Sequence, residues 1–399
     1  MSEHGVCIVG AGPAGLMLGL LLARAGVGTT VVEKHTDFLR DFRGDTIHPS
    51  TLEVMHELGF LEEFLTLPHQ KAPQLHAEIA GRSATIADFS RLPTRCKYIA
   101  FMPQWDFLSF LAEKAQELPT FRLMMGYETV GLIEHDDRVS GVRIRHPDGG
   151  EETLGAALVV GADGRESVLR ATAGLEVEDL GSSVDVLWMK LSRRPDDPVQ
   201  AMSHAGPSQG LVMIDRGDYW QLGYVIRKGG FDGTREQGLP AFRAKLAAVA
   251  PLPAERFEEL AGWDQVRLLN VRMDRLKRWW KPGLLCIGDA AHAMSPIGGV
   301  GVNLAIQDAV AAANILAEPL RDGALTEAHL AAVEARRRFP TRATQSVQLM
   351  MRRKRKPDAA EPNRSGPPAF LRAIARSRLL PHLTGRLIGI GFRPEHLRH

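Results

Sequence analysis

Cysteine is scarce in this sequence, with only Cys7, Cys96 and Cys286 among 399 residues. Residues so far apart argue against a disulfide framework and against a cysteine-based metal site, so no metal is predicted. Cys7 and Cys286 lie within apolar, strand-like runs, and buried free thiols are therefore expected. Such thiols are typical of a reducing compartment, which favours the cytoplasm.

A large excess of charge of either sign is also absent. Lys and Arg number 49 against 47 Asp and Glu, and a formal net charge of +2 gives no indication of a nucleic-acid partner. No signal peptide or membrane-spanning run is recognisable, because glycines and Pro13 interrupt the first apolar stretch. An apolar share of 44% and a length of 399 residues are typical of a globular protein with two or three domains.

The most informative stretch is present near the N-terminus. An apolar run over 6–9 leads into Gly10-x-Gly12-x-x-Gly15 and an apolar helix, and a second strand-like run ends at Glu33. Gly10 permits a tight turn, Gly12 lets the backbone approach a pyrophosphate, and Gly15 allows close packing of helix and strand. Free N–H groups at the helix start attract phosphates, and an acid at Glu33 suits an adenosine ribose. This pattern predicts a dinucleotide site.

Two further motifs follow apolar strand-like runs later in the chain. Asp163-Gly164 follows residues 158–160, and Gly288-Asp289 follows residues 284–287. Pro296, Gly298, Gly299, Gly301 and Asn303 then lead into an Ala-rich helix expected from about 302 to 316. Bare N–H groups at such a helix start stabilise negative charge, which suits the pyrimidine edge of a reduced flavin. Asp163-Gly164 alone would be an ordinary turn.

The segments between these motifs have a different character. Residues 183–191, 211–214, 219–227 and 264–273 are expected to form an antiparallel sheet, since they are strand-like and joined by Pro- and Gly-containing loops. Tyr219 and Tyr224, five residues apart, should face opposite sides of that sheet. An amphipathic helix is expected from 104 to 117. Ser50 and Glu53 are expected to form a capping box at the start of another helix.

With the three motifs in this order, residues 4–345 resemble the FAD-dependent aromatic hydroxylases of the p-hydroxybenzoate hydroxylase fold, the group A flavoprotein monooxygenases. The resemblance implies an α/β fold with a discontinuous Rossmann-like FAD-binding domain, an inserted antiparallel-sheet substrate domain and a short helical C-terminal tail. The implied boundaries are 1–74, 100–180 and 278–350 for the FAD-binding domain, 75–99 and 181–277 for the substrate domain, and 351–399 for a basic linker and helical tail.

Transferred residue by residue, the family pattern implies where FAD would lie. The diphosphate would lie at the first glycines and near Arg43, the ribose at Glu33, the adenine near the backbone of Val130, and the ribityl chain at Asp289. The backbone from Gly298 to Asn303 would cradle the isoalloxazine. The implied cofactor residues are Gly10, Gly12, Pro13, Ala14, Gly15, Glu33, Lys34, Arg43, Gln104, Val130, Asp163, Gly288, Asp289, Pro296, Gly298, Gly299, Gly301, Val302 and Asn303.

The activity that the resemblance implies is monooxygenation. FAD would be reduced transiently by NADPH or NADH, and a hydroperoxyflavin formed with O2 would hydroxylate an apolar aromatic or conjugated small molecule. Two alternatives stay open: a reductase or dehydrogenase of the same fold acting on an alkene or isoprenoid, and a flavin-loaded binding protein for an aromatic compound. The family's halogenases are disfavoured because no Gly-Trp-x-Trp-x-Ile-Pro segment occurs. Neither the substrate nor the oligomeric state is indicated.

Two regions have more than one interpretation. His48, beside the expected flavin edge, is either a catalytic acid or base on the substrate side or a loop histidine bonded to backbone. The C-terminal region is basic, with 16 Lys or Arg against three acids from Arg336 onward. Residues 352–368 are expected to be a linker, and the amphipathic stretch 370–380 either contacts an anionic membrane or, as we favour, packs on the FAD-binding domain.

Overall fold

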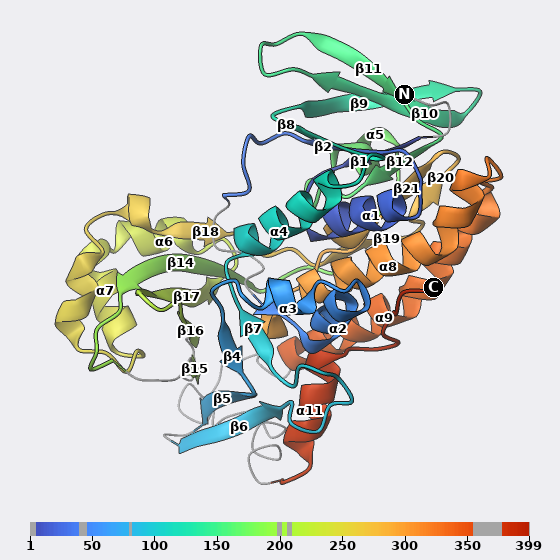
Figure 1. Cartoon of the computed structure of the whole chain (residues 1–399). Helices are drawn as coiled ribbons and strands as arrows, with labels where there is room; N and C mark the ends of the chain where they lie inside the picture. Colours follow the sequence, from blue (N-terminus) through green and yellow to red (C-terminus); the bar gives the residue numbers. More distant parts are fainter. Residues whose placement is uncertain are drawn as a thin grey trace.

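Two sheets organise the molecule, with helices between and around them (Figure 1). The computed structural model describes residues 5–39, 46–79, 82–197, 202–205, 210–353 and 377–398. The first sheet has six strands in the order β20-β21-β12-β1-β2-β8, and all neighbours are parallel except β20 and β21. Its strands are β1 (Val6–Val9), β2 (Thr29–Glu33), β8 (Phe121–Met125), β12 (Leu158–Gly161), β20 (Trp280–Lys281) and β21 (Leu284–Cys286).

Both faces of this sheet are covered, which explains why its inner strands are apolar at successive positions rather than alternating. One face packs against α1, α4 and α8, and the other packs against a three-stranded sheet in the order β11-β10-β9. All three cysteines are buried free thiols, as expected for Cys7 and Cys286. The covering elements are α1 (Pro13–Arg24), α4 (Gln104–Gln116), α8 (Val300–Arg321), β9 (Glu128–His135), β10 (Arg138–Arg145) and β11 (Glu151–Gly155).

The second sheet has seven strands in the order β18-β14-β17-β16-β15-β5-β6 and lies to one side of the first (Figure 1). Its outer face packs on α7 and the turn η1 around Trp220 and Phe257. The strands expected between residues 183 and 273 are confirmed, although the last is only three residues long. Its elements are β5 (Gln74–Ile79), β6 (Arg82–Asp88), β14 (Val184–Ser192), β15 (Met202–Ala205), β16 (Gly210–Asp215), β17 (Tyr219–Arg227), β18 (Arg267–Leu269), α6 (Phe231–Glu236), α7 (Leu239–Ala247) and η1 (Ala254–Glu259).

Short elements connect the two sheets. A small sheet of β3, β7 and β4 lies between them, together with the helices α2 and α3, and β13 pairs with β19. The capping box expected at Ser50 is wrong: α2 begins at Pro49 with His48 as its N-cap, two residues before the expected N-cap, and Ser50 Oγ contacts residues far away in sequence. The connecting elements are β3 (Thr46–Ile47), α2 (Pro49–Glu57), α3 (Leu61–Phe64), β4 (Gln70–Ala72), β7 (Ile99–Phe101), α5 (Val168–Thr172), β13 (Val177–Asp179), η2 (Trp263–Gln265) and β19 (Asp274–Leu276).

The described C-terminal residues return to the body of the protein. After α9 (Glu327–Arg353), residues 354–376, most of the expected linker and amphipathic stretch, lie outside the described residues. Helix α11 (Leu380–Gly389) then packs along β6, and the last residues contact α2 and α8. The described tail therefore packs on two parts of the chain: α11 lies on the second sheet through β6, and the last residues lie on α2 and α8, beside the nucleotide motifs.

Within the described residues, one helical stretch, Ile297–Arg321, is long and apolar enough to cross a membrane. Because 78% of its apolar window is buried inside the protein, it has the character of a core helix. It runs beside α1 and contributes Ile306, Ala309 and Val310 to the main core.

Candidate functional site

The turn between β1 and α1 has the geometry that its glycines predict. Gly10 has φ +101°, and a Cβ there would lie 2.5 Å from the Ala162 carbonyl oxygen. A Cβ on Gly15 would lie 1.9 Å from the Gly10 carbonyl oxygen, so helix and strand require glycine at that crossing. Around Gly12, in contrast, no atom lies within 4 Å of a Cβ position. Gly10 and Gly15 thus serve the fold, whereas Gly12 faces open space.

The start of α1 is free to bind an anion. Gly12 is its N-cap, Pro13 occupies the first turn, and no side chain caps the helix and no acid lies in that turn. The first N–H groups of a helix have no intrahelical partner, and the helix dipole places positive potential there. Ala14 is buried beneath this end, with a Cβ 3.1 Å from the position that a Cβ on Gly288 would take. The arrangement fits a diphosphate.

Glu33 ends β2 beside this helix start. Its Oε2 accepts a hydrogen bond from the Ala11 N–H at 2.9 Å, and its Oε1 accepts one from the His35 N–H at 3.1 Å. The side chain is only about a tenth exposed. The carboxylate is therefore held at the carboxyl edge of the sheet, where α/β folds bind their ligands.

Strands β12 and β21 bring two further carboxylates to the same edge. Asp163 follows β12 and Asp289 follows β21, and both strands run parallel to β1. Arg165 Nε donates to Asp289 Oδ2 at 2.8 Å. Burial raises the pKa of Asp163 above its ordinary value of 3.8, against hydrogen bonds from Ser167 and from backbone N–H groups that lower it.

Three buried polar atoms have no hydrogen-bond partner among the described residues: Asp163 Oδ1 and Arg165 Nη1, which follow β12, and Thr129 Oγ1 on β9. Buried polar atoms in native proteins nearly always have a partner. Acceptors and donors with unmet hydrogen-bonding capacity therefore lie near the uncapped start of α1. A nucleotide with hydroxyl groups and phosphates meets those needs.

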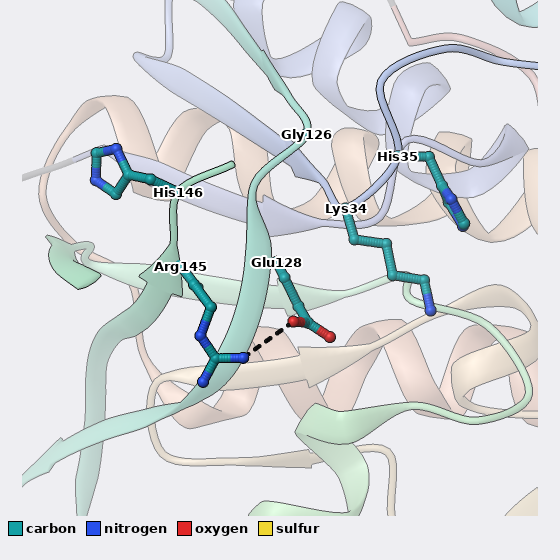
Figure 2. Close-up of a pocket in the computed structure, with 6 residues that line it drawn as sticks. All are labelled: Lys34, His35, Gly126, Glu128, Arg145 and His146. Carbon is teal, nitrogen blue, oxygen red and sulfur yellow. Dashed lines mark hydrogen bonds and ion pairs between the residues drawn. The ribbon is translucent and has the colours of Figure 1, made fainter. Parts of the chain in front are cut away.

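A pocket of about 390 Å³ opens just beyond Glu33 (Figure 2). Lys34, Glu128 and Arg145 extend to the same side of their strands, and Arg145 Nη1 lies 3.3 Å from Glu128 Oε2. Val130, two residues after Glu128 on β9, is half-buried. The pocket is completed by His35, Gly126 and His146.

The second glycine-rich segment is a short turn, η4 (Ile297–Gly299), followed directly by α8. Pro296 is its N-cap, and both Gly298 and Gly299 have left-handed backbones with φ +81° and +63°. A Cβ on Gly299 would lie 2.5 Å from Thr46 Oγ1, whereas around Gly301 no atom lies within 4 Å of a Cβ position. We call residues 296–303 the flavin loop, after the expectation that their backbone would cradle the isoalloxazine.

Asn303 and Val302 fix the start of α8. The Asn303 side chain is 2% exposed, and its Oδ1 accepts hydrogen bonds from Ser50 Oγ at 2.7 Å and Thr51 Oγ1 at 3.0 Å. Val302 is buried in the main core. These side chains fix the position of the helix start, and its backbone N–H groups remain as binding groups for an anion.

His48 lies directly behind the flavin loop. Its Nδ1 is 2.8 Å from the Ile388 carbonyl oxygen, its Nε2 is 3.0 Å from the Gly299 carbonyl oxygen, and the side chain is fully buried. With both ring nitrogens occupied by backbone, the geometry favours the loop histidine over an acid or base that meets substrate.

Behind the turn after β21 lies a chain of buried ionisable groups. Asp308 accepts from His292 Nε2 at 2.6 Å, from Arg337 Nε at 2.9 Å and from the Gly288 N–H at 3.1 Å. Arg337 Nη1 in turn donates to Glu395 Oε1 at 3.2 Å. The network connects the Gly288-Asp289 turn, α8, α9 and the C-terminal residues.

The second sheet has an outer face, which packs on α7, and an inner face on the opposite side. Tyr224 points into the outer core and Tyr219 to the other face, as expected from their spacing. On the inner face Trp188 lies over Gly223, where a Cβ would be 2.8 Å from the indole ring. Arg216 Nε donates to Gln221 Oε1 at 2.9 Å, and Arg216 acts electrostatically on Asp106 of α4.

The structure brings most of the predicted cofactor residues to one edge of the first sheet and to the flavin loop. Gln104 starts α4. Arg43 lies outside the described residues. Sequence reasoning missed Arg165, Thr51, Ile388 and Glu395 and gave Ser50 a different role, because each of these residues acts through a partner that is distant along the chain.

Comparison with known proteins gives consistent results. Residues 3–347 match a family model described as "FAD binding domain". The chain is 37% identical over 352 residues to 6-methylpretetramide 4-monooxygenase of Streptomyces rimosus, covering 87% of this chain and 83% of that protein. It is 32% identical to rifampicin monooxygenase of Streptomyces venezuelae, covering 76% of this chain and 62% of that protein.

Solved structures share the fold. The crystal structure of PqsL from Pseudomonas aeruginosa in complex with 2-aminobenzoylacetate superposes with a TM-score of 0.73 at 25% identity, covering 86% of this chain and 94% of that one. The anhydrotetracycline hydroxylase OxyS from Streptomyces rimosus superposes with a TM-score of 0.76 at 23% identity, covering 96% of this chain and 75% of that one.

Proposed function

We propose that the substrate of this protein is a planar phenol of several fused rings. The chain belongs to the FAD binding domain family of FAD-dependent aromatic monooxygenases. The observation on which this rests is the 37% identity, over most of both chains, to an enzyme named for 6-methylpretetramide. Three further relatives are named for tetracycline intermediates or rifampicin. A large polyketide-type aromatic is the chemistry these names share.

FAD is the cofactor, and relatives of this kind use NAD(P)H as reductant. The residues fit it: an uncapped helix start at Gly12, buried polar atoms that lack partners, and a glycine-rich loop at the start of α8. When bound, FAD supplies hydride acceptance from the nicotinamide and activation of O2. We propose that Gly12 and Arg43 hold the diphosphate, Glu33 the ribose, and the pocket beside Lys34 and Val130 the adenine.

The chain's own residues then perform three tasks in this proposal. Asp289, oriented by Arg165, holds the ribityl hydroxyls and so sets the position of the ring along the groove. The N–H groups at the start of α8 stabilise negative charge on that ring, since they are preorganised and face no side chain at Gly301. The second sheet covers the ring and excludes water, which preserves the reactive oxygen species.

The substrate is proposed to lie between the flavin loop and the inner face of the second sheet, within the expected domain of residues 75–99 and 181–277. The Trp188 indole lies flat on Gly223 there, and we propose that the half-buried indole provides a planar apolar surface for the ring system. Arg216 and Gln221 provide polar groups at one end of that face, near Asp106. Flat apolar area with polar groups at one edge matches a fused-ring phenol.

The substrate class can be tested with anhydrotetracycline as the probe. The purified protein, loaded with FAD, is mixed with NADPH under oxygen-18 gas, with salicylate as a one-ring control. We expect NADPH oxidation to be stimulated at least tenfold more by the tetracyclic probe, with one labelled oxygen in the product. Equal stimulation by salicylate would contradict the proposed class, and an unlabelled product would indicate the reductase alternative instead.

A further inference from the structure

The imidazole of His48 bridges two backbone carbonyls that are 89 residues apart, Gly299 in the flavin loop and Ile388 at the end of α11. Both contacts have hydrogen-bond length, at 3.0 and 2.8 Å, and the ring is fully buried. Its backbone is the N-cap of α2, and Pro49 follows directly. The ring is therefore fixed in place, with carbonyl oxygens at both nitrogens.

A neutral imidazole cannot satisfy this geometry. It has one N–H and one lone pair, so one nitrogen donates and the other directs its lone pair at a carbonyl oxygen. Only the imidazolium donates to both. The charged ring, however, is costly in a dry interior unless an anion lies nearby. Burial lowers the pKa of His48 below its ordinary value of 6.5, and the two carbonyls raise it by less.

Among the described residues, no carboxylate lies where it would stabilise a positive charge on the His48 ring. On α2, Glu53 accepts from the Arg95 N–H and Glu57 accepts from the Leu397 N–H. On β6, Asp88 faces His382 of α11 at 3.5 Å, and on α8 Asp308 is held by His292 and Arg337. Arg386 of α11 is exposed to solvent. No charged side chain of the described residues contributes to the pKa shift of His48.

We propose that His48 takes up a proton when the flavin is reduced, and that its imidazolium, held between Gly299 and Ile388, is the counter-charge of the anionic ring. Hydride transfer brings two electrons and one proton to the flavin and leaves it negative. A second proton moves from solvent to His48, so the site gains two electrons and two protons. His48 is thus a positioning residue that acts through the flavin loop. This inference rests on the proposed position of the ring beside Gly299.

The midpoint potential of the bound FAD, measured as a function of pH, tests the proposal. When one additional proton is taken up per two electrons, the midpoint potential falls by about 30 mV more for each unit of pH increase. We expect the wild type to show this additional slope above pH 6.5, the ordinary pKa of histidine. His48→Gln keeps an amide donor but takes up no proton, so its slope should be shallower by about 30 mV per pH unit. His382→Gln, on α11 but facing Asp88, is the matched control and should behave as the wild type.

Two results would overturn the proposal, and they are distinguishable. A His48→Gln protein with a shifted potential and flavin spectrum but an unchanged slope would place the ring beside His48 and refute proton uptake. A variant identical to His382→Gln in potential and spectrum at every pH would show that the ring does not lie there. If the His48→Gln protein does not retain FAD, the proposal is tested instead by nitrogen-15 NMR of the histidine rings in the wild-type protein. One buried ring must change from neutral to imidazolium on anaerobic reduction, and no change refutes the proposal.

Discussion

The two ends of the proposed nucleotide site are built in different ways. At the proposed diphosphate end, β1, α1 and β2 lie within 28 residues, and the proposed binding groups are backbone N–H groups plus one carboxylate. At the proposed flavin end, the loop at 296–303 is held by side chains from positions 46–51. Two of these side chains, His48 and Ser50, also contact the carbonyl oxygens of Ile388 and Gly389. The first end is a local structure, and the second exists only when three distant segments meet.

This difference indicates how each end should fail. A defect at the local end is a steric or hydrogen-bond defect that leaves the rest of the chain folded. At the distant end, loss of one polar side chain weakens the attachment of a segment, because polar contacts supplement the apolar packing of α11 on β6. The polar contacts are made at Ile388, Gly389, Glu395, His396 and Leu397. The following substitutions are ordered from the largest expected effect to the smallest.

Asp308→Asn should be the most damaging change at the distant end. The carboxylate is fully buried between His292 and Arg337, and removing one partner of a buried ion pair costs about 3–5 kcal/mol of unfolding free energy. Urea denaturation measures this loss. Asp322→Asn, at an exposed pair with Arg321, is the control and should change the free energy by about 0.5 kcal/mol or less. A stability equal to that control would contradict the role of the network.

The same carboxylate gives a pH signature. Burial alone would raise the pKa of Asp308, but His292 and Arg337 outweigh burial and hold it below the ordinary 3.8. A lowered pKa means that its contribution is fully present above 3.8 and is lost as pH falls below that value. The wild type should therefore lose more unfolding free energy than Asp308→Asn as the pH is lowered through this range. If the unfolding free energies of the wild type and Asp308→Asn changed in parallel with pH, Asp308 would not be the group responsible for this loss of stability.

Gly15→Ala and Gly12→Ala separate folding from binding at the local end. The first places a Cβ 1.9 Å from the Gly10 oxygen and should cost about 1–3 kcal/mol of unfolding free energy. The second meets no protein atom within 4 Å, so the apoprotein should stay within about 1 kcal/mol of wild type while FAD binding weakens. Urea denaturation and fluorescence titration with FAD measure the two effects. Unimpaired FAD binding by Gly12→Ala would show that the diphosphate does not bind at this turn.

Ser50→Ala tests the attachment of the tail. Ser50 Oγ lies 2.7 Å from Asn303 Oδ1 and 3.0 Å from the Gly389 oxygen, so its loss leaves a buried acceptor unpaired at about 1–2 kcal/mol. Amide hydrogen exchange of α11 should accelerate by roughly tenfold. Thr384→Ala removes a hydroxyl that bonds only within α11, to Leu380, and is the control. Equal protection in both variants would show that the tail is held elsewhere.

The smallest effect is expected at Glu33. Replacement by Ala removes the carboxylate that we propose as the acceptor for the ribose, and a hydrogen bond of this kind is worth about 0.5–1.5 kcal/mol, or roughly a two- to tenfold weaker Kd for FAD. Asp289→Ala should weaken FAD more, because it also leaves Arg165 without its partner at 2.8 Å. Equilibrium dialysis against FAD ranks the two. If Glu33→Ala weakened FAD binding more than Asp289→Ala, Glu33 rather than Asp289 would be the main carboxylate that anchors FAD.

The sequence by itself determined the strand–turn–helix of residues 6–24, the alternation of the second sheet and the helix that follows the flavin loop. These depend on short-range rules: glycine where a Cβ has no room, periods of two or 3.6 residues, and N–H groups left free at a helix start. Only the tertiary structure decided that Ser50 binds Asn303 rather than capping its helix, and that His48 joins Gly299 to Ile388. A hydroxyl or an imidazole carries no spacing signal for a partner 250 to 340 residues away, so its role is settled only when packing removes water and leaves one partner within reach.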